Sequence, residues 1–298
     1  MDELPVDVDP AEIDSAMRPF LVSANGGLRW TMEVARRRAA TVVRMVTGRE
    51  AARDRSAIES EYRDAWGAGY RRYRLDRTDL KAKPWGWRGR RLLLDPAAAA
   101  RLRTILFAAV LDELKPRRVL EVGSGNGINL LSLASAFPEV HFTGLELTEE
   151  GVEQTRRAQS DAGIVDMIQS YSPLETRDRS AIGRIDFVQG DASAMPFDNS
   201  SFDLVMTVLA VEQMERIRDE ALAEIARVSG RHVLMLEPFR DMNAGGFKRL
   251  YVHSRGYFRG SIEELGGFGL TPLWAAADYP QEAFLGTALV LAEKPSSG

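Results

Sequence analysis

The chain has 298 residues, of which 45% are hydrophobic and 28% charged, and its formal net charge is −4. A chain of this kind can bury a sizeable core, and one main domain with an appended segment fits it better than two independent domains. The absence of cysteine excludes disulfides, thiolate metal sites and a cysteine nucleophile. Three scattered histidines do not suggest a zinc site, so no metal is expected. With no signal peptide and no apolar run that could span a bilayer, a cytoplasmic location is expected.

Residues 1–94 are expected to form a mostly helical N-terminal arm. Apolar residues recur in it at helical spacing from Trp30 onwards. A strong helix start follows, with Asp95 as N-cap and Pro96 in the first turn. The expected domain boundary therefore lies here, with a second unit over 95–298.

Charge is unevenly divided along the chain. Residues 16–103 contain 21 lysines and arginines against 9 acidic residues, so the arm is basic and the remainder acidic. Its densest stretch, 62–91, interleaves arginines with tyrosines and tryptophans. Three interpretations stay open: a lid or homodimer contact that complements the acidic body, a site for an anionic small substrate, and a surface for nucleic acid or a membrane. Nucleic acid is not expected, because the total charge is negative and no known module is visible.

The most informative motif is VLEVGSGNG, residues 119–127, where a buried apolar strand runs into a turn of alternating glycines. Gly123, Gly125 and Gly127 let the backbone turn sharply and approach a ligand closely. The apolar run 128–137 that follows has helical spacing, so the glycines lie between a strand and a helix N-terminus. This arrangement is typical of a nucleotide-type cofactor site.

The glycine spacing separates two classes of cofactor. Dinucleotide folds use G-x-G-x-x-G and rest a pyrophosphate on the helix, whereas this chain has G-x-G-x-G preceded by Glu121. A carboxylate beside the turn would repel a pyrophosphate but suits a cationic amino-acid ligand. At these residues the chain resembles the class I S-adenosylmethionine-dependent methyltransferases.

Further elements follow in the order that this resemblance implies. A strand over 140–147 ends in Glu146, where an α/β cofactor fold places a carboxylate for the ribose hydroxyls. Thr148 is the expected N-cap of the next helix. Further strands are expected over 185–189, 202–208, 232–237, 270–276 and 287–293, with a helix over 222–228 and a capping box at Ser261 and Glu264 before a later helix. The last strand is expected to be antiparallel in the edge region, and 164–184 to be an insertion bordering the substrate pocket.

The resemblance implies a Rossmann-like, seven-stranded, mostly parallel sheet with helices on both faces, and S-adenosyl-L-methionine as cofactor. It implies Glu121 at the amino-acid portion of the cofactor, Glu146 at the ribose and Asp191 at the adenine. Ala192 and Met195 are expected to contact the base. The other expected cofactor contacts are Gly123, Ser124, Gly125, Asn126, Gly127 and Leu147.

Catalysis in this family is mainly placement of a nucleophile against an already electrophilic methyl group. The resemblance implies that the acceptor is held by residues after the fourth and fifth strands, such as Glu237. Glu212 is a candidate base there, and the long loop expected after the fifth strand holds Tyr251 and His253 as further candidates. The segment VLAVEQM lacks the Asn or Asp, Pro-Pro and aromatic cluster of adenine methylases, which argues against a DNA-modifying enzyme.

We therefore expect a methyltransferase acting at oxygen or nitrogen of a small or medium-sized metabolite. One alternative is a catalytically silent methyltransferase-like fold that binds nucleic acid or a protein partner through the basic arm. A nicotinamide oxidoreductase is a third interpretation.

Overall fold

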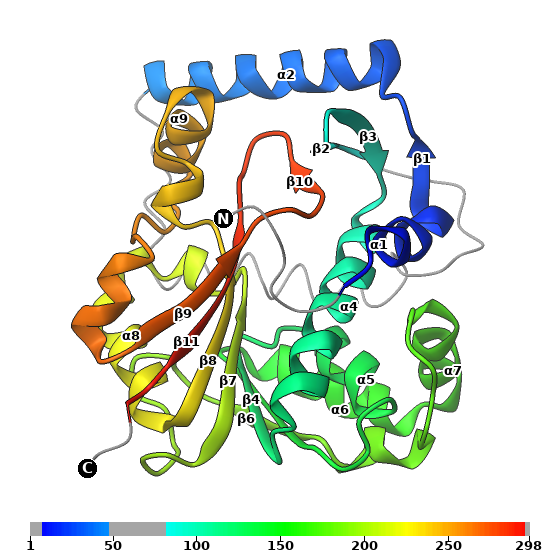
Figure 1. Cartoon of the computed structure of the whole chain (residues 1–298), viewed down its shortest axis with the longest axis vertical. Helices are drawn as coiled ribbons and strands as arrows, with labels where there is room; N and C mark the ends of the chain where they lie inside the picture. Colours follow the sequence, from blue (N-terminus) through cyan, green and yellow to red (C-terminus); the bar gives the residue numbers. More distant parts are fainter. Residues whose placement is uncertain (1–7, 48–81, 296–298) are drawn as a thin grey trace.

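The computed structural model describes residues 8–47 and 82–295. Its main element is a seven-stranded sheet of order β6-β5-β4-β7-β8-β11-β9 (Figure 1). The strands are β4 Arg118–Val122, β5 His141–Glu146, β6 Asp186–Gln189, β7 Phe202–Val208, β8 Ser229–Glu237, β9 Thr271–Ala276 and β11 Ala288–Glu293. Neighbours pair in parallel from β6 to β8, and β11 is antiparallel to both β8 and β9. This confirms the expected sheet; β11 is antiparallel as expected and lies one strand in from the edge.

Helices cover both faces of this sheet (Figure 1). One face carries α4 Pro96–Leu114, α5 Ile128–Ala134, α6 Glu149–Ser160 and α7 Ala162–Tyr171, and the other carries α8 Arg218–Val228 and the 3-10 helix η7 Glu263–Phe268. Alternate strand residues serve the two layers, as Val119 and Leu120 of β4 do. A sheet buried on both faces explains why its strands read as continuous apolar runs.

Hydrogen bonds confirm the predicted helix starts at Asp95 and Thr148, whereas the segment after Ser261 is a 3-10 helix with Ile262 as its N-cap. Asp95 Oδ1 accepts from the Ala97 N–H at 2.8 Å, and Thr148 Oγ1 accepts from the Gly151 N–H at 3.2 Å. At the start of η7, Ser261 Oγ accepts from the backbone N–H of Glu264 at 3.3 Å. These side chains satisfy N–H groups that have no partner within the helix.

The N-terminal arm contains the expected helices together with strands that its sequence does not reveal. Its elements are α1 Pro10–Met17, η1 Arg18–Phe20, β1 Leu21–Ser23, α2 Gly27–Val46, β2 Lys83–Trp87 and β3 Arg90–Leu94. The strands form a second, antiparallel sheet, β1-β3-β2-β10, whose last member is β10 Gln281–Glu282. The β2 segment KPWGW holds a proline and a glycine, which disfavour strands, and it is stabilised by partners distant in sequence.

Two other expectations concern the arm and the insertion. Of the basic aromatic stretch, the part up to residue 81 lies outside the described residues. The domain boundary at residue 95 stays a prediction. In the expected insertion, α7 is followed by the 3-10 helix η3 Arg179–Arg184, and the buried Tyr171 donates its hydroxyl to the Ala97 carbonyl at 3.0 Å. This segment therefore packs on α4.

Arg101 joins three helices at one buried point. It belongs to α4 and is 8% exposed. Its Nε donates to the carbonyl of Ala16 in α1 at 2.5 Å, and its Nη1 donates to the carbonyl of Tyr171 in α7. The bond to Ala16 thus ties the arm to the main domain, and the bond to Tyr171 ties α7 to α4.

Replacing Arg101 by methionine should destabilise the protein by about 2–4 kcal/mol, because two buried carbonyls lose a charged donor while the side-chain volume is largely kept. Urea unfolding measures this loss. Arg157→Met is the control, since the Arg157 side chain is 79% exposed and its ion pair with Glu153 is solvated. Equal unfolding midpoints for the two variants would contradict the fastening role of Arg101.

Candidate active site

A cavity of about 430 Å³ lies at the carboxyl ends of the central parallel strands. Residues after β4, β5, β6 and β7 line it, together with Arg103 of α4. In an open α/β sheet, ligands bind outside the carboxyl ends of the strands, beside the point where the strand order reverses. Here that point lies between β4 and β7.

The turn after β4 requires glycine because neighbouring segments approach its backbone closely. Gly123 has φ +72°, and a Cβ there would lie 2.6 Å from the Cβ of Ala210 in the segment after β7. Gly127 has φ +68°, and a side chain there would collide with Thr155 of α6. Both positions therefore need glycine for conformation and for space. Gly123, Ser124, Gly125 and Asn126 line the cavity; Gly127 supports the turn from behind.

Glu146, at the end of β5, holds the turn in place. It is 6% exposed, and its Oε2 accepts from the Gly125 N–H at 3.0 Å. Its Oε1 accepts from the Thr148 N–H at 3.1 Å and from the Thr148 hydroxyl at 2.6 Å. The carboxylate faces the cavity beside Leu147. Its expected role toward a ribose stays a prediction.

One end of the cavity gathers buried polar atoms that lack hydrogen bonds. Asn129 Nδ2 donates to Glu121 Oε1 at 2.6 Å. Four further atoms find no hydrogen-bond partner within the part of the chain that the structure describes: Glu121 Oε2, Asn129 Oδ1, Ser124 Oγ and Arg103 Nε. Buried polar atoms are rarely left unsatisfied, so these acceptors and the guanidinium donor indicate a ligand that carries both kinds of group. The zwitterionic end of an amino acid has this character.

Burial also controls the charge of Glu121. The side chain is 1% exposed, and burial raises the pKa of its carboxyl to about 7. The hydrogen bond from Asn129 and the charge of Arg103 act in the opposite direction, and the charge of Glu146 raises the pKa further. A cationic ligand next to Glu121 would restore its ionised form.

The opposite wall of the cavity is the turn after β6. Asp191 Oδ1 accepts from the Ser193 N–H at 2.9 Å and from the Ser193 hydroxyl at 2.8 Å. Asp191 and Ala192 line the cavity. Met195 does not line it and is buried in the core on the α8 side of the sheet. Their contacts with the cofactor stay predictions.

A third buried carboxylate shapes the wall that follows β7. Glu237, at the end of β8, has no exposed surface and accepts the backbone N–H groups of Ala210, Val211 and Glu212 at 3.0–3.1 Å. Burial raises the pKa of Glu237 to about 7 even with these donors. Leu209 adopts φ +52° just before them. Glu237 therefore lies behind this wall and holds it from within.

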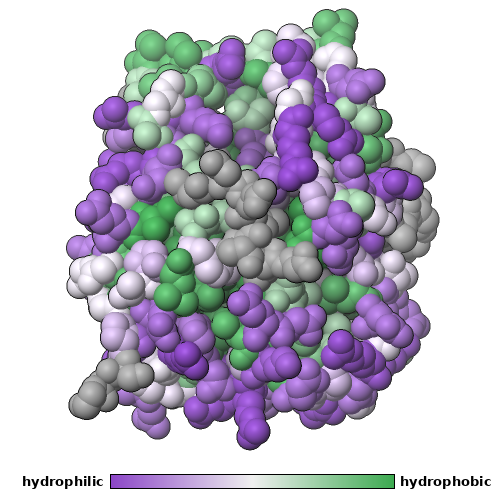
Figure 2. All heavy atoms as spheres, viewed as in Figure 1, coloured by the Kyte–Doolittle hydropathy of each residue, from purple (hydrophilic) through white to green (hydrophobic). Residues whose placement is uncertain are grey.

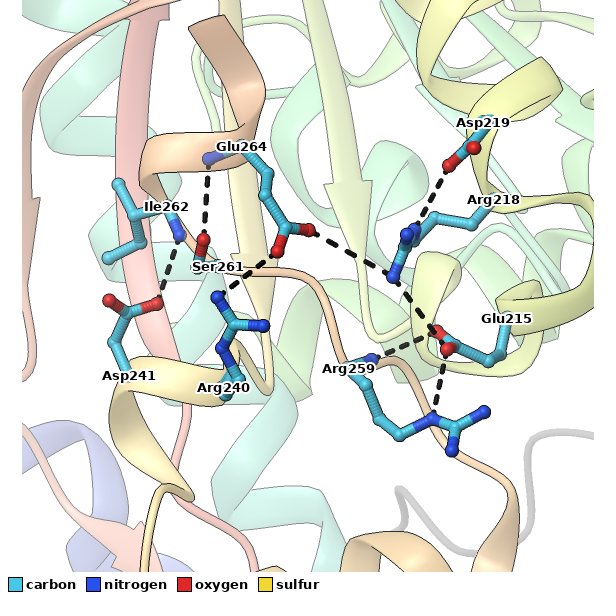
Figure 3. Close-up of polar contacts among 9 residues, drawn as sticks. All are labelled: Glu215, Arg218, Asp219, Arg240, Asp241, Arg259, Ser261, Ile262 and Glu264. Atoms are coloured by element: carbon cyan, nitrogen blue, oxygen red, sulfur yellow. Dashed lines mark hydrogen bonds and ion pairs between the residues drawn. The ribbon is translucent and has the colours of Figure 1, made fainter. Parts of the chain in front are cut away.

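An ion-pair network holds the same wall from outside (Figure 3). The wall continues into η5 Glu215–Ile217, where Glu215 accepts from the backbone and side chain of Arg259, both at 2.9 Å. Arg218 lies between Glu215 and Glu264, and Glu264 also pairs with Arg240 of η6 Arg240–Met242 at 3.1 Å. The wall after β7 is thereby tied to the segments that follow β8.

The three candidate catalytic residues are not brought together. Glu212 lines the cavity, is 8% exposed and accepts from Gln213 Nε2 at 2.6 Å. The segment expected as a long loop after β8 contains α9 Gly246–Arg255, and both Tyr251 and His253 lie on it. Tyr251 packs against Phe284, and neither residue lines the cavity. No residue of 164–184 lines it either.

The polar residues of the site that sequence reasoning missed include Arg103, Asn129 and Arg216. Asn129 lies in the first turn of α5, eight residues after Glu121, and points back to it. Arg103 and Arg101 are the two cations in an otherwise apolar stretch of α4. Charged residues in a stretch that is otherwise buried could have indicated the site, because such side chains are buried only where they bind a partner.

Residues 120–233, from β4 to β8, match the family model described as a methyltransferase domain. These residues therefore form a methyltransferase domain, in agreement with the resemblance to the class I S-adenosylmethionine-dependent methyltransferases. The matched range includes the glycine turn, Glu146 and Asp191, and S-adenosylmethionine is the cofactor of this domain family.

Curated relatives resemble the methyltransferase domain over part of their length. A fatty-acid O-methyltransferase of Mycolicibacterium smegmatis is 34% identical over 116 residues, 39% of this chain and 34% of that protein. The ubiquinone/menaquinone biosynthesis C-methyltransferase UbiE of Methylobacterium nodulans is 33% identical over 140 residues, 46% of this chain and 48% of its own. A phthiotriol/phenolphthiotriol dimycocerosates methyltransferase of Mycobacterium tuberculosis is 30% identical over 116 residues, 39% and 35% of the two chains. The matches thus span less than half of each relative.

Glu121→Gln should stabilise the ligand-free protein at pH 8 but not at pH 5. The carboxyl has a pKa of about 7 in the folded protein and 4.5 as an isolated group. Its favourable contribution to the free energy of unfolding is therefore fully present below pH 4.5 and is lost as the pH rises through 7. The neutral amide removes this loss and gains about 2 kcal/mol at pH 8 relative to wild type. Urea unfolding at the two pH values measures the difference. The exposed Glu153→Gln is the control, and a gain independent of pH would contradict the assignment.

Proposed function

We propose that the protein transfers the methyl group of S-adenosylmethionine to an oxygen or nitrogen atom of a small lipophilic molecule. The observation that carries the proposal is the cavity itself. Unsatisfied buried groups of Glu121, Asn129 and Arg103 lie at its polar end, and the wall that follows β7 combines apolar side chains with Glu212 and Arg216.

The polar end and the strand ends fit the cofactor. Glu121 and Asn129 offer oxygen acceptors to its ammonium group, and Arg103 offers a guanidinium to its carboxylate. Glu146 and Asp191 would accept from the ribose and the adenine, with Ala192 against the base. S-adenosylmethionine supplies a methyl group already activated by its sulfonium centre. The protein then has to hold the acceptor in line with that methyl group and exclude water.

The wall after β7 suits an amphiphilic acceptor. Its cavity-lining residues include Val208, Leu209, Met214 and Ile217, which favour an apolar chain. Arg216 lines the same wall and would pair with an anionic head group. One relative is named for a fatty-acid acceptor, which agrees with this combination.

Glu212 is the carboxylate on this wall and would receive a proton from the acceptor. A hydroxyl or a protonated amine must lose a proton when it is methylated, whereas a carboxylate acceptor need not. The three backbone bonds to Glu237 and the network around Glu215 keep the Glu212 segment in position. Tyr251 and His253 lie on α9 and do not line the cavity, so Glu212 is the preferred candidate base.

Calorimetry should detect binding of S-adenosylmethionine or S-adenosylhomocysteine to the wild-type protein. Arg103→Met and Asp191→Ala should each weaken it about tenfold or more, because each removes one charged hydrogen bond to the ligand. The surface variant Arg157→Met should bind like wild type. An absence of binding heat in the wild type would remove the basis of the proposal.

Incubation with methyl-labelled cofactor and a cell extract should place label in the organic-soluble fraction. Glu212→Gln should lower turnover about 10²-fold or more for a hydroxyl or amine acceptor and leave cofactor affinity unchanged. Label confined to water-soluble products would contradict the lipophilic acceptor. Cofactor binding without any labelled product would favour the catalytically silent fold.

A further inference from the structure

Helix α2 is the outermost element on one side of the molecule. It lies across the top of Figure 1 and packs on α9, β2 and β3. α9 follows the carboxyl end of β8, and β10, which pairs with β2, follows the carboxyl end of β9. α2 is therefore on the side of the molecule toward which the cavity end of the sheet faces.

The outward face of α2 carries an apolar stripe. Its large members are highly exposed: Leu28 76%, Met32 62%, Val42 48%, Val43 60% and Val46 81%. The exposed Ala35 and Ala39 lie between them, so that apolar positions recur every three or four residues from Leu28 to Val46. At 1.5 Å per residue the stripe is about 27 Å long. Figure 2 shows hydrophobic side chains gathered over both ends of α2, at the top of the molecule.

The opposite face of α2 is docked, which fixes the rotation of the helix. Trp30 Nε1 donates to the carbonyl of Trp85 in β2 at 3.0 Å. Val34 is buried in a cluster with Tyr251 and Phe284. The guanidinium of Arg37 lies 5.2 Å from the centre of the Phe284 ring. Since these contacts occupy the inner face, the stripe cannot turn inward.

The charges on α2 select among the surfaces that could cover this stripe. The helix contains five arginines and one acidic residue, Glu33, which pairs with Arg36 and Arg37. Two copies packed through this face would bring two strongly basic helices together, and like charges oppose that contact. An anionic surface is attracted instead, because arginine side chains reach charged head groups while the stripe enters the apolar layer. Leu273 of β9 is the one large exposed apolar residue outside α2 in the described ranges.

We propose that α2 binds the protein to anionic lipid bilayers, lying in the plane of the interface with its apolar stripe inserted. An amphipathic helix with an apolar face and a basic polar face binds membranes in this way without crossing them. None of the helices within 8–47 and 82–295 is long and apolar enough to cross a bilayer. This inference does not depend on methyl transfer, because binding to vesicles is measured without cofactor or acceptor.

Flotation of the full chain with vesicles tests the proposal. Wild type should float with vesicles of phosphatidylcholine and phosphatidylglycerol, float about tenfold less with phosphatidylcholine alone, and dissociate as salt is raised. The combined variant Leu28→Gln, Met32→Gln, Val43→Gln and Val46→Gln should lose about tenfold or more of the anionic binding. Glutamine is a good helix former at these exposed positions, and circular dichroism checks that the variant is folded.

A matched pair of single variants separates α2 from general surface hydrophobicity. Val46→Gln should weaken vesicle binding, and Leu273→Gln on β9 should not. Failure of the wild type to float with anionic vesicles would overturn the proposal, as would equal losses in both single variants. A wild-type dimer in light scattering that the combined variant converts to a monomer would assign the stripe to a second copy of the chain and overturn it too.

Discussion

The site depends on the requirement that a buried carboxylate be matched by hydrogen bonds or charge. Three strands carry an almost inaccessible glutamate at or next to their carboxyl ends: Glu121 in β4, Glu146 in β5 and Glu237 in β8. Glu146 and Glu237 are matched from within, chiefly by backbone N–H groups of neighbouring loops. Each thereby fixes a loop that lines the cavity. Glu121 keeps one oxygen without a hydrogen-bond partner among the described residues, and this residue lines the cavity.

The same requirement explains why the cavity has two chemically different parts. Near β4, polar atoms of Glu121, Asn129, Ser124 and Arg103 await a ligand. Beyond β7 the backbone N–H groups are already satisfied by Glu237, and the lining includes the apolar side chains of Val208, Leu209, Met214 and Ile217 beside the charged Glu212 and Arg216. A charged cofactor end and a lipophilic acceptor can therefore meet in one space of about 430 Å³.

The arm adds a second kind of surface to this arrangement. Its inner side is joined to the domain through Arg101, the packing of Val34 with Tyr251 and Phe284, and the strand pairing of β2 with β10. Its outer side is basic and carries the exposed stripe of α2. If the acceptor is lipophilic, as proposed, an interfacial helix on the cavity side would bring the enzyme to the phase in which such molecules reside. The basic character found in the sequence then serves an external surface as well as internal contacts such as Arg88 with Asp278.

The sequence by itself determined the sheet, the helix starts and the place of the site. These follow from local chemistry: apolar runs that must be buried, side chains such as Asp95 that cap adjacent N–H groups, and glycines where φ is positive. It also determined the cofactor class, through the spacing of the glycines and the strand-end acids. Only the tertiary structure decided which groups share the cavity. Arg103 of α4 lines the cavity. Glu237 lies behind the wall that follows β7, and Tyr251 is packed in a separate hydrophobic cluster. Only the tertiary structure shows that β2 pairs with β10, about 195 residues later in the chain, and that the apolar stripe of α2 faces outward. Contacts of this kind join residues distant in sequence, and no local pattern encodes them.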